Sequence, residues 1–396
     1  MTEKRPLRLY LDSSDYSVLS DPTRAELKAP GVLESLRSHI DAGNVECFFS
    51  GAHLSEMAPV DKAYADAAER RASLMVELCG KNVFVSHNRL MSHEVRRALG
   101  LEATQFDPVR RDGEWFPEGA AEMLPITEVD RAASMQEAIQ ELGREARRKA
   151  AKKLMKRGKP KRSTQQSLVN NSRSGSLDEI LSIYPMKPES ARILSRFVVG
   201  DATAAEATKA FQDSLRDPRW MMKWFEQHHD KLTPFIAWLR GPAQDVVEKL
   251  DELAKSIADA RDKLSPDAFA ELFVVKQWQE WQDDMVVKIA NRLAVNTRTT
   301  KTLTTEQIDE YCPGLSVAVR SIHSAWRTVT LNRPRQAKLS DFPDAMHAAY
   351  APYSDIYRAD SFMAPYVANQ ASRYGTTVVP KLTALPQAID GLLAKR

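Results

Sequence analysis

Over the first hundred residues, short apolar runs alternate with longer segments in which apolar residues recur every three to four positions. The short runs predict strands at PLRLYLDS (6–13), Val45–Ser50 and Asn82–Ser86, and the longer segments predict helices at Val32–Gly43, from His53 to about Leu78, and at Arg89–Leu99. Such strand–helix alternation favours right-handed βαβ units on a parallel sheet.

The pattern changes after residue 100. Residues 101–128 are rich in Pro and Gly, and nearly everything from about Glu128 to Leu293 has helical periodicity. Alternation resumes near residue 339, with helices expected at 341–351, 362–374 and 386–394 and strands at 355–358 and 376–379. The simplest account is one α/β domain, made of residues 1–100 and 331–396 and interrupted by a predominantly helical insertion at 101–330.

Four carboxylates lie at positions that a parallel sheet would bring close together. Asp12 closes the first strand, Glu56 lies one turn into the helix after the second, Asp344 lies in the first turn of the helix that reopens the pattern, and Asp360 follows the strand at 355–358. Ligand sites in such sheets form beyond the carboxyl ends of the strands. Each acid alone is typical of a helix cap, so only the conjunction indicates a site.

Clustered carboxylates raise one another's pKa unless cations neutralise them. Their hard oxygen atoms suit Mg²⁺ or Mn²⁺ rather than zinc. Ions of this kind can polarise a phosphodiester and activate a water molecule. The four acids therefore predict a divalent-metal site for phosphodiester hydrolysis.

The segment SDFPDAMHAAYAPYSDIYRADSFM (Ser340–Met363) resembles the C-terminal signature of PIN-like domain nucleases: a helix opening with Asp-Ala-x-His-Ala-Ala, a short strand, then an acid. YLDSSDYSVLSD (Tyr10–Asp21) is similar to the family's first strand, FFSGAHLSEM (Phe48–Met57) to its second strand and Glu-bearing helix, and GTTVVPKLTALPQAI (Gly375–Ile389) to its closing strand and helix. The resemblance covers roughly residues 7–99 and 339–396 and leaves the insertion without a counterpart.

The resemblance implies a three-layer α/β/α fold with a central parallel sheet, and RNA cleavage by metal-assisted hydrolysis. It carries the metal-ligand role onto Asp12, Glu56, Asp344 and Asp360, and a water-positioning or substrate-binding hydroxyl onto Ser13 or Ser14. The family often has Thr or Ser two residues before its last Asp, and this chain has Arg358 there. Whether Asp360 or the nearby Asp355 is the closer metal ligand stays open, as does whether Arg358 contacts phosphate.

Charge is distributed unevenly. Residues 144–162 hold eleven Lys or Arg and one acid, leaving 45 basic and 52 acidic residues elsewhere. A run with so few acids lacks the i,i+4 pairs of an ordinary solvated helix, which favours contact with nucleic acid through its cations. We expect a helix up to Gly158 whose phosphate-binding side chains include Arg147, Arg148, Lys152, Lys153, Lys156 and Arg157.

The chain has the 43% hydrophobic and 28% charged composition of a globular protein, and no apolar run approaches the ~20 residues of a membrane helix. Its three separate cysteines indicate neither a disulfide framework nor a zinc ribbon, so a cytoplasmic setting is expected. The leading hypothesis is an endoribonuclease; a DNA nuclease of flap type and a non-catalytic RNA-binding or assembly module are the alternatives. A toxin or defence role, with an inhibitor or partner protein, is compatible with the chain, but no residue indicates it.

Overall fold

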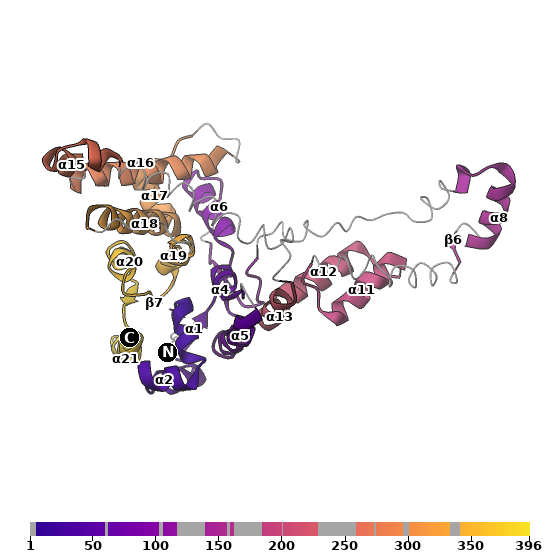
Figure 1. Ribbon diagram of the computed structural model, residues 1–396, viewed down its shortest axis with the longest axis horizontal. Coiled ribbons are helices and arrows are strands. Elements are labelled where there is room, and N and C mark those ends of the chain that lie inside the picture. The colour runs from indigo at the N-terminus through magenta and orange to yellow at the C-terminus, as the bar shows by residue number, and fades with distance from the viewer. Residues whose placement is uncertain are drawn as a thin grey trace. The chain divides into compact units, whose positions relative to one another are not determined.

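The computed structural model divides the chain into two compact units, one made of residues 1–117 and 238–396 and the other of residues 118–237 (Figure 1). The residues that it describes are 5–59, 62–102, 106–116, 139–156, 159–161, 184–199, 201–228, 259–272, 275–295, 301–332 and 341–396. Both expected halves of the α/β domain belong to the first unit.

The first unit contains a parallel sheet with the strand order β2–β1–β7–β8. Its strands are β1 (Leu7–Tyr10), β2 (Val45–Phe48), β7 (Ile356–Arg358) and β8 (Thr377–Val379). β1 lies between β2 and β7, so a strand from the N-terminal segment pairs directly with one from the C-terminal segment. β2 lies on one side of β1 and β7 on the other, so the strand order changes direction at β1. In parallel sheets of this kind, a crevice forms at such a point, beyond the carboxyl ends of the strands.

A further pair of strands continues the sheet beyond β2. The bridge between Phe49 and Val83 is parallel and places β3 (Val83–Phe84) beside the end of β2. β3 pairs in turn with β4 (Val109–Arg110) in the antiparallel sense. The three strands expected in the first hundred residues are therefore confirmed.

Most of the expected helices are confirmed too. They are α3 (Val32–Asp41) and α6 (His87–Ala98) in the N-terminal segment and α19 (Asp341–Ala348), α20 (Ala364–Ala371) and α21 (Leu385–Ala394) in the C-terminal segment. Two further helices, α1 (Ser13–Leu19) and α2 (Pro22–Lys28), were not expected from the sequence.

One expected helix, from His53 to about Leu78, is divided. It forms α4 (Gly51–Met57), the 3₁₀ helix η1 (Lys62–Tyr64) and α5 (Ala65–Cys79). Ala58 leaves the helical region with ψ 122° directly before Pro59. A proline disfavours the helical conformation in the residue that precedes it, which explains the break.

Both faces of the sheet are covered. Tyr10 and Phe48 belong to a core cluster that includes residues of α6, α18 (Pro313–Asn332) and α20, whereas the neighbouring Leu9 and Cys47 lie outside this cluster and are equally buried. Successive side chains of a strand point to opposite faces, so these two sets occupy the two sides of one sheet. Burial on both faces is typical of parallel sheets.

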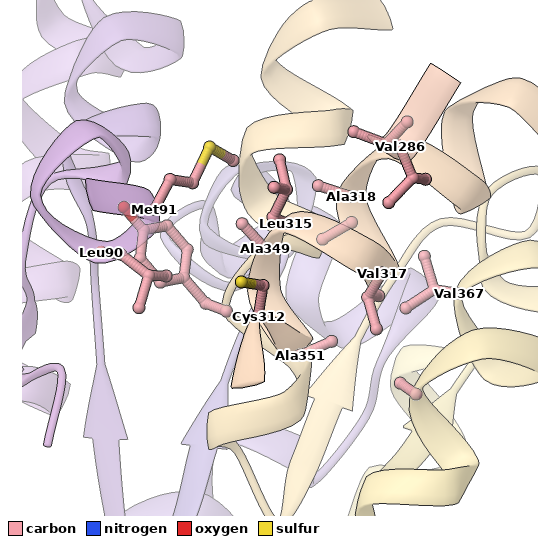
Figure 2. Packing of buried hydrophobic residues seen from close by; sticks show 14 of the residues in the cluster. Leu90, Met91, Val286, Cys312, Leu315, Val317, Ala318, Ala349, Ala351 and Val367 are labelled. Carbon is pink, nitrogen blue, oxygen red and sulfur yellow. The ribbon is translucent and has the colours of Figure 1, made fainter. Parts of the chain in front are cut away.

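Three helices from the region expected to be an insertion belong to the first unit. Val286 of α16 (Val275–Ala294), Ile308 of α17 (Thr305–Tyr311) and Leu315 of α18 share the core cluster with Leu90 of α6. Figure 2 shows Val286, Leu315 and Leu90 in this packing, together with Ala349 and Val367 from the C-terminal segment. The boundary expected at residue 330 therefore differs from the division of the structure, because these apolar faces pack on α6 and not on a separate helical domain.

A buried carboxylate joins α6 to α18. Glu94 accepts hydrogen bonds from the backbone N–H groups of Gly314 (2.7 Å) and Leu315 (3.0 Å) and from the hydroxyl of Tyr353. Burial raises the pKa of Glu94 to about 7, although these three donors lower it. The first N–H groups of a helix have no partner inside the helix, so this side chain completes the start of α18.

The second unit is helical where the structure describes it. It contains α8 (Arg144–Leu154), α11 (Pro188–Val199), α12 (Ala204–Leu215) and α13 (Pro218–His228). The helix expected up to Gly158 ends at Leu154, where β5 (Met155–Lys156) and β6 (Lys159–Pro160) pair as an antiparallel hairpin. None of the helices in the described part of either unit is long and apolar enough to cross a membrane.

Candidate metal centre

Asp12 follows β1 directly and begins α1. Its Oδ1 accepts a hydrogen bond from the backbone N–H of Ser14 (2.7 Å), and its own N–H donates to Oδ2 of Asp15 (3.0 Å). This reciprocal arrangement is a capping box. Asp12 therefore caps a helix at the carboxyl end of the central strand, and the residue is partly exposed.

Glu56 lies in the last turn of α4 and meets His347 of α19. The distance from His347 Nε2 to Glu56 Oε2 is 2.8 Å. Burial alone would raise the pKa of Glu56 and lower that of His347. The attraction between the two groups outweighs burial, so the pKa of Glu56 is lowered and that of His347 is raised.

The imidazole of His347 is held from its other side by the central strand. Tyr10 Oη lies 2.6 Å from His347 Nδ1 and 2.6 Å from Ser50 Oγ. These contacts are fully buried and fix the ring orientation. A continuous chain of polar contacts thus runs from Ser50 through Tyr10 and His347 to the Glu56 carboxylate.

Asp344 is the most strongly perturbed acid of the four. Burial raises its pKa, and the negative charges of Glu56, Asp360 and Asp12 raise it further, to about 8, although His347 acts in the opposite direction. The three acids that repel Asp344 are the other three carboxylates expected from the sequence. The structure therefore brings all four acids into one electrostatically coupled group at the carboxyl ends of β1 and β7.

Asp360 and Asp355 lie at opposite ends of β7. Asp360 follows the carboxyl end, and its Oδ1 accepts a hydrogen bond from the Met363 N–H (2.6 Å). Asp355 precedes the strand and pairs with Arg5 (2.7 Å) and Arg396 (3.2 Å). Of the two alternatives, the structure brings Asp360 and not Asp355 beside the other acids, because a three-residue strand separates them.

Arg358 does not point to a substrate. It is 5% exposed and forms a buried ion pair with Asp15, with 2.7 Å between Nη2 and Oδ1. Its Nη1 also donates to the backbone oxygen of Val379 (2.9 Å). Because its guanidinium is occupied inside the fold, the structure gives no support to a contact between Arg358 and phosphate.

The two candidate serines differ in position. The Ser13 hydroxyl hydrogen-bonds Glu56 and lies 3.4 Å from His347 Nε2, so it belongs to the acidic group. The Ser14 side chain is exposed, and its backbone N–H binds Asp12. Ser13 is thus the hydroxyl that the structure brings to the site.

The expected phosphate-binding cations belong to the second unit. Arg147, Arg148, Lys152 and Lys153 are exposed on α8. Lys156 lies in β5, with its side chain outside the described residues, and Arg157 lies outside them altogether.

Sequence reasoning missed several groups behind the acids. Tyr10 and Ser50 were treated as ordinary strand residues, and His53 received no role. His53 Nδ1 accepts from the Ser50 N–H (3.1 Å), and its Nε2 lies 2.9 Å from the Leu11 carbonyl, so it holds the ends of β1 and β2 together. Burial, with the nearby charge of His347, lowers the pKa of His53 to about 3, which keeps it neutral. The Ser-x-x-His spacing before Glu56 was the available signal, since it matches a capping box.

The four candidate ligands are of the chemical type that a hard divalent cation prefers. All four ligand candidates are carboxylates, and burial together with repulsion from the other three holds a proton on Asp344 at neutral pH. Among the residues that the structure describes, however, no three His, Cys, Asp or Glu side chains stand close enough together to hold an ion as they are. A cation would need to draw the carboxylates inward by side-chain rotation.

No family model matches the chain, and neither curated proteins nor solved structures give a match. A function for the chain is therefore inferred from its own residues and from the motifs that resemble PIN-like domains.

Proposed function

We propose that the chain is a metal-dependent endoribonuclease of PIN-like type. The observation that carries the proposal is the buried carboxyl of Asp344 beside three other acids: burial, and then the charges of Glu56, Asp360 and Asp12, raise its pKa to about 8. Carboxylates gathered at one sheet edge repel one another, and a bound cation would relieve this repulsion. The strand order adds support, because the crevice at the switch point beside β1 is the usual ligand site of such sheets.

Asp12, Glu56, Asp344 and Asp360 would hold Mg²⁺ or Mn²⁺. When bound, the ion supplies positive charge that polarises a phosphodiester and lowers the pKa of an attacking water molecule. The chain itself orients the ligands: Ser14 and Asp15 fix Asp12, His347 and Ser13 fix Glu56, and Met363 fixes Asp360. These contacts orient Asp12, Glu56 and Asp360.

RNA is the substrate class that the resemblance favours. The cations of α8 add support, because six exposed Lys and Arg side chains on one short helix would attract the phosphates of a polyanion. Neither feature separates RNA from DNA by itself, so the assay has to compare both.

The test is cleavage of single-stranded RNA by the purified chain with Mn²⁺ or Mg²⁺. We expect Asp344→Asn and Asp12→Asn each to lower the cleavage rate at least ~100-fold, by loss of ligand charge at the transition state. Asp355→Asn is the matched control, since it removes an acid from the opposite end of β7 and should keep the rate. Equal rates in Asp344→Asn and Asp355→Asn would refute the assignment.

Two other outcomes would favour the alternative functions. Preferred cleavage of branched or duplex DNA would indicate a DNA nuclease. Absence of cleavage, together with calorimetry in which Mn²⁺ binds the wild type no better than Asp344→Asn, would indicate a non-catalytic RNA-binding or assembly module.

A further inference from the structure

A pocket of about 350 Å³ opens beside the candidate metal centre, and it shares Glu56 with that centre. This volume is in the range of small-ligand sites. The pocket is enclosed by α1, α2, the end of α4, η1 and α5, all of which belong to the first unit. Its lining residues are Ser17, Ser20, Asp21, Arg24, Glu56, Ala58, Pro59, Tyr64, Ala67, Arg70 and Arg71.

Three arginines from two helices face this pocket. Arg71 is fixed, because its guanidinium donates to the carbonyl oxygens of Ala67 (3.1 Å) and Met57 (3.3 Å). Burial lowers the pKa of Arg71; the charge of Glu56 raises it, and the like charges of Arg24 and Arg70 lower it further. Arg24 and Arg70 are therefore close enough to Arg71 for their charges to act on it, and an anion bound beside Arg71 would relieve this repulsion.

The acids of the pocket do not satisfy these arginines. Asp21 caps α2 and accepts from the N–H groups of Thr23 (3.1 Å) and Arg24 (3.2 Å), and Glu56 is bound to His347. Within the described part of the chain, neither Arg24 nor Arg70 forms an ion pair, and both are exposed. Two of the three guanidinium groups are thus available for an anion from solvent.

An aromatic side chain completes the pocket wall. Tyr64, in η1, is 57% exposed, although large aromatic side chains usually bury most of their surface. An exposed ring beside guanidinium groups is the arrangement that stacks a nucleobase while arginine binds the neighbouring phosphate.

We propose that this pocket binds one phosphate group of the RNA strand, between Arg24, Arg70 and Arg71, with the adjacent base on Tyr64. This proposal rests on the proposed function for the identity of the strand. A planar guanidinium donates two parallel hydrogen bonds to a phosphate, so arginine suits the role better than lysine. Because Glu56 lines both the pocket and the metal centre, the bound phosphate holds the strand in register with the acids.

The test measures binding separately from cleavage. Fluorescence anisotropy of a labelled single-stranded RNA is followed over a range of salt concentrations, using the full-length Asp344→Asn chain with divalent ions chelated. We expect Arg24→Gln with Arg70→Gln to weaken binding about tenfold, and to lower the magnitude of the salt slope by about 0.7, the value for one phosphate on a single strand. Lys28→Gln is the matched control: Lys28 is an exposed cation on the same helix as Arg24, does not line the pocket, and should bind as the parent does.

A second pair of variants tests the stacking. Tyr64→Ala should weaken binding about tenfold, whereas Tyr64→Phe should keep the parent affinity, since the ring and not the hydroxyl makes the contact. Melting temperatures equal to that of the parent would show that these surface substitutions leave the fold intact.

The proposal is overturned if the arginine double variant binds RNA as tightly as Lys28→Gln, if the parent binds no single-stranded RNA, or if arginine-dependent binding is stronger for duplex DNA. Failure of the pocket and failure of the nuclease are distinguishable. Arginine-dependent binding without Asp344-dependent cleavage would refute the nuclease alone, and the reverse would refute the pocket alone.

Discussion

Asp15 and Arg358 form a buried ion pair that joins two segments 343 residues apart, with Arg358 Nε and Nη2 both donating to the carboxylate. Their side chains are 2% and 6% exposed. Asp15 also accepts the N–H of Asp12, so the pair connects β7 to the first acid of the candidate centre. Burial raises the pKa of Asp15 to about 6 even though Arg358 lowers it, and the carboxylate is therefore charged at neutral pH only with its partner in place.

Removal of one partner should destabilise the first unit strongly. We expect Arg358→Ala to lower the free energy of unfolding by about 3–5 kcal/mol, because it leaves Asp15 buried without a counter-charge. Urea denaturation measures this value. Arg373→Ala is the control, since the Arg373–Asp309 pair is 38% and 28% exposed and should contribute less than about 1 kcal/mol.

An apolar replacement of both partners separates charge from packing. Asp15→Leu with Arg358→Met should recover most of the stability lost in Arg358→Ala, because no buried charge remains. A loss of less than about 1 kcal/mol in Arg358→Ala would contradict the interpretation of a desolvated pair.

The sheet could be predicted from sequence because its signal is local. Short apolar runs mark each strand, and the polar residue after each run marks its carboxyl end, so the positions of Asp12 and Asp360 followed from strand boundaries alone. The partners of these acids could not be predicted in this way. Arg358 falls within a strand and contacts Asp15 through the fold, and nothing in the spacing of either residue encodes that contact.

The division of the chain into two units could not be predicted from the local hydrophobic pattern either. The helices at 275–294 and 313–332 have the same amphipathic periodicity as the helices of the second unit, so periodicity predicted one continuous insertion. Periodicity does not say which part of the protein the apolar face of a helix packs against. Here the apolar faces of α16 and α18 pack on Leu90 and its neighbours in α6. The pocket beside Glu56 was missed for a similar reason, because Arg24 and Arg70 lie 46 positions apart and line one pocket only in the folded chain.

The pKa of Asp344 makes the stability of the metal-free protein depend on pH. Asp344 keeps its proton up to about pH 8 in the folded state, whereas an ordinary Asp titrates near 3.8. Between these values the folded chain binds more protons than the unfolded chain, so its contribution to stability is complete below about pH 4 and is lost as pH rises through 8. Asp344→Asn removes this contribution.

We therefore expect the melting temperature of Asp344→Asn, relative to wild type in chelator, to rise steadily from pH 4 to pH 8. Differential scanning calorimetry measures this difference in melting temperature. Because both proteins are compared at the same pH, the contributions of other titrating groups, such as Glu94, cancel. Added Mn²⁺ should stabilise the wild type at pH 8 and leave Asp344→Asn nearly unchanged. A difference independent of pH would show that Asp344 is not held protonated by its neighbours.

The positively charged side chains of α8 are exposed to solvent. Its only acid, Glu145, pairs with Lys149 at 3.0 Å, and both side chains are largely exposed. The remaining cations have no acid on their own helix. Their exposed position favours contact with a polyanion over a structural role in packing.

Neutralising four of these cations should weaken RNA binding and reduce its dependence on salt. We expect replacement of Arg147, Arg148, Lys152 and Lys153 by Gln, which preserves helix propensity, to lower the magnitude of the salt slope by up to about 3, since each phosphate contact on a single strand contributes about 0.7. The matched control removes four exposed cations from α11, α12 and α13 of the same unit, namely Arg192, Lys209, Arg219 and Lys223. Anisotropy titrations measure both slopes. Equal slopes in the two quadruple variants would mean that net charge, and not the position of α8, governs the attraction of RNA.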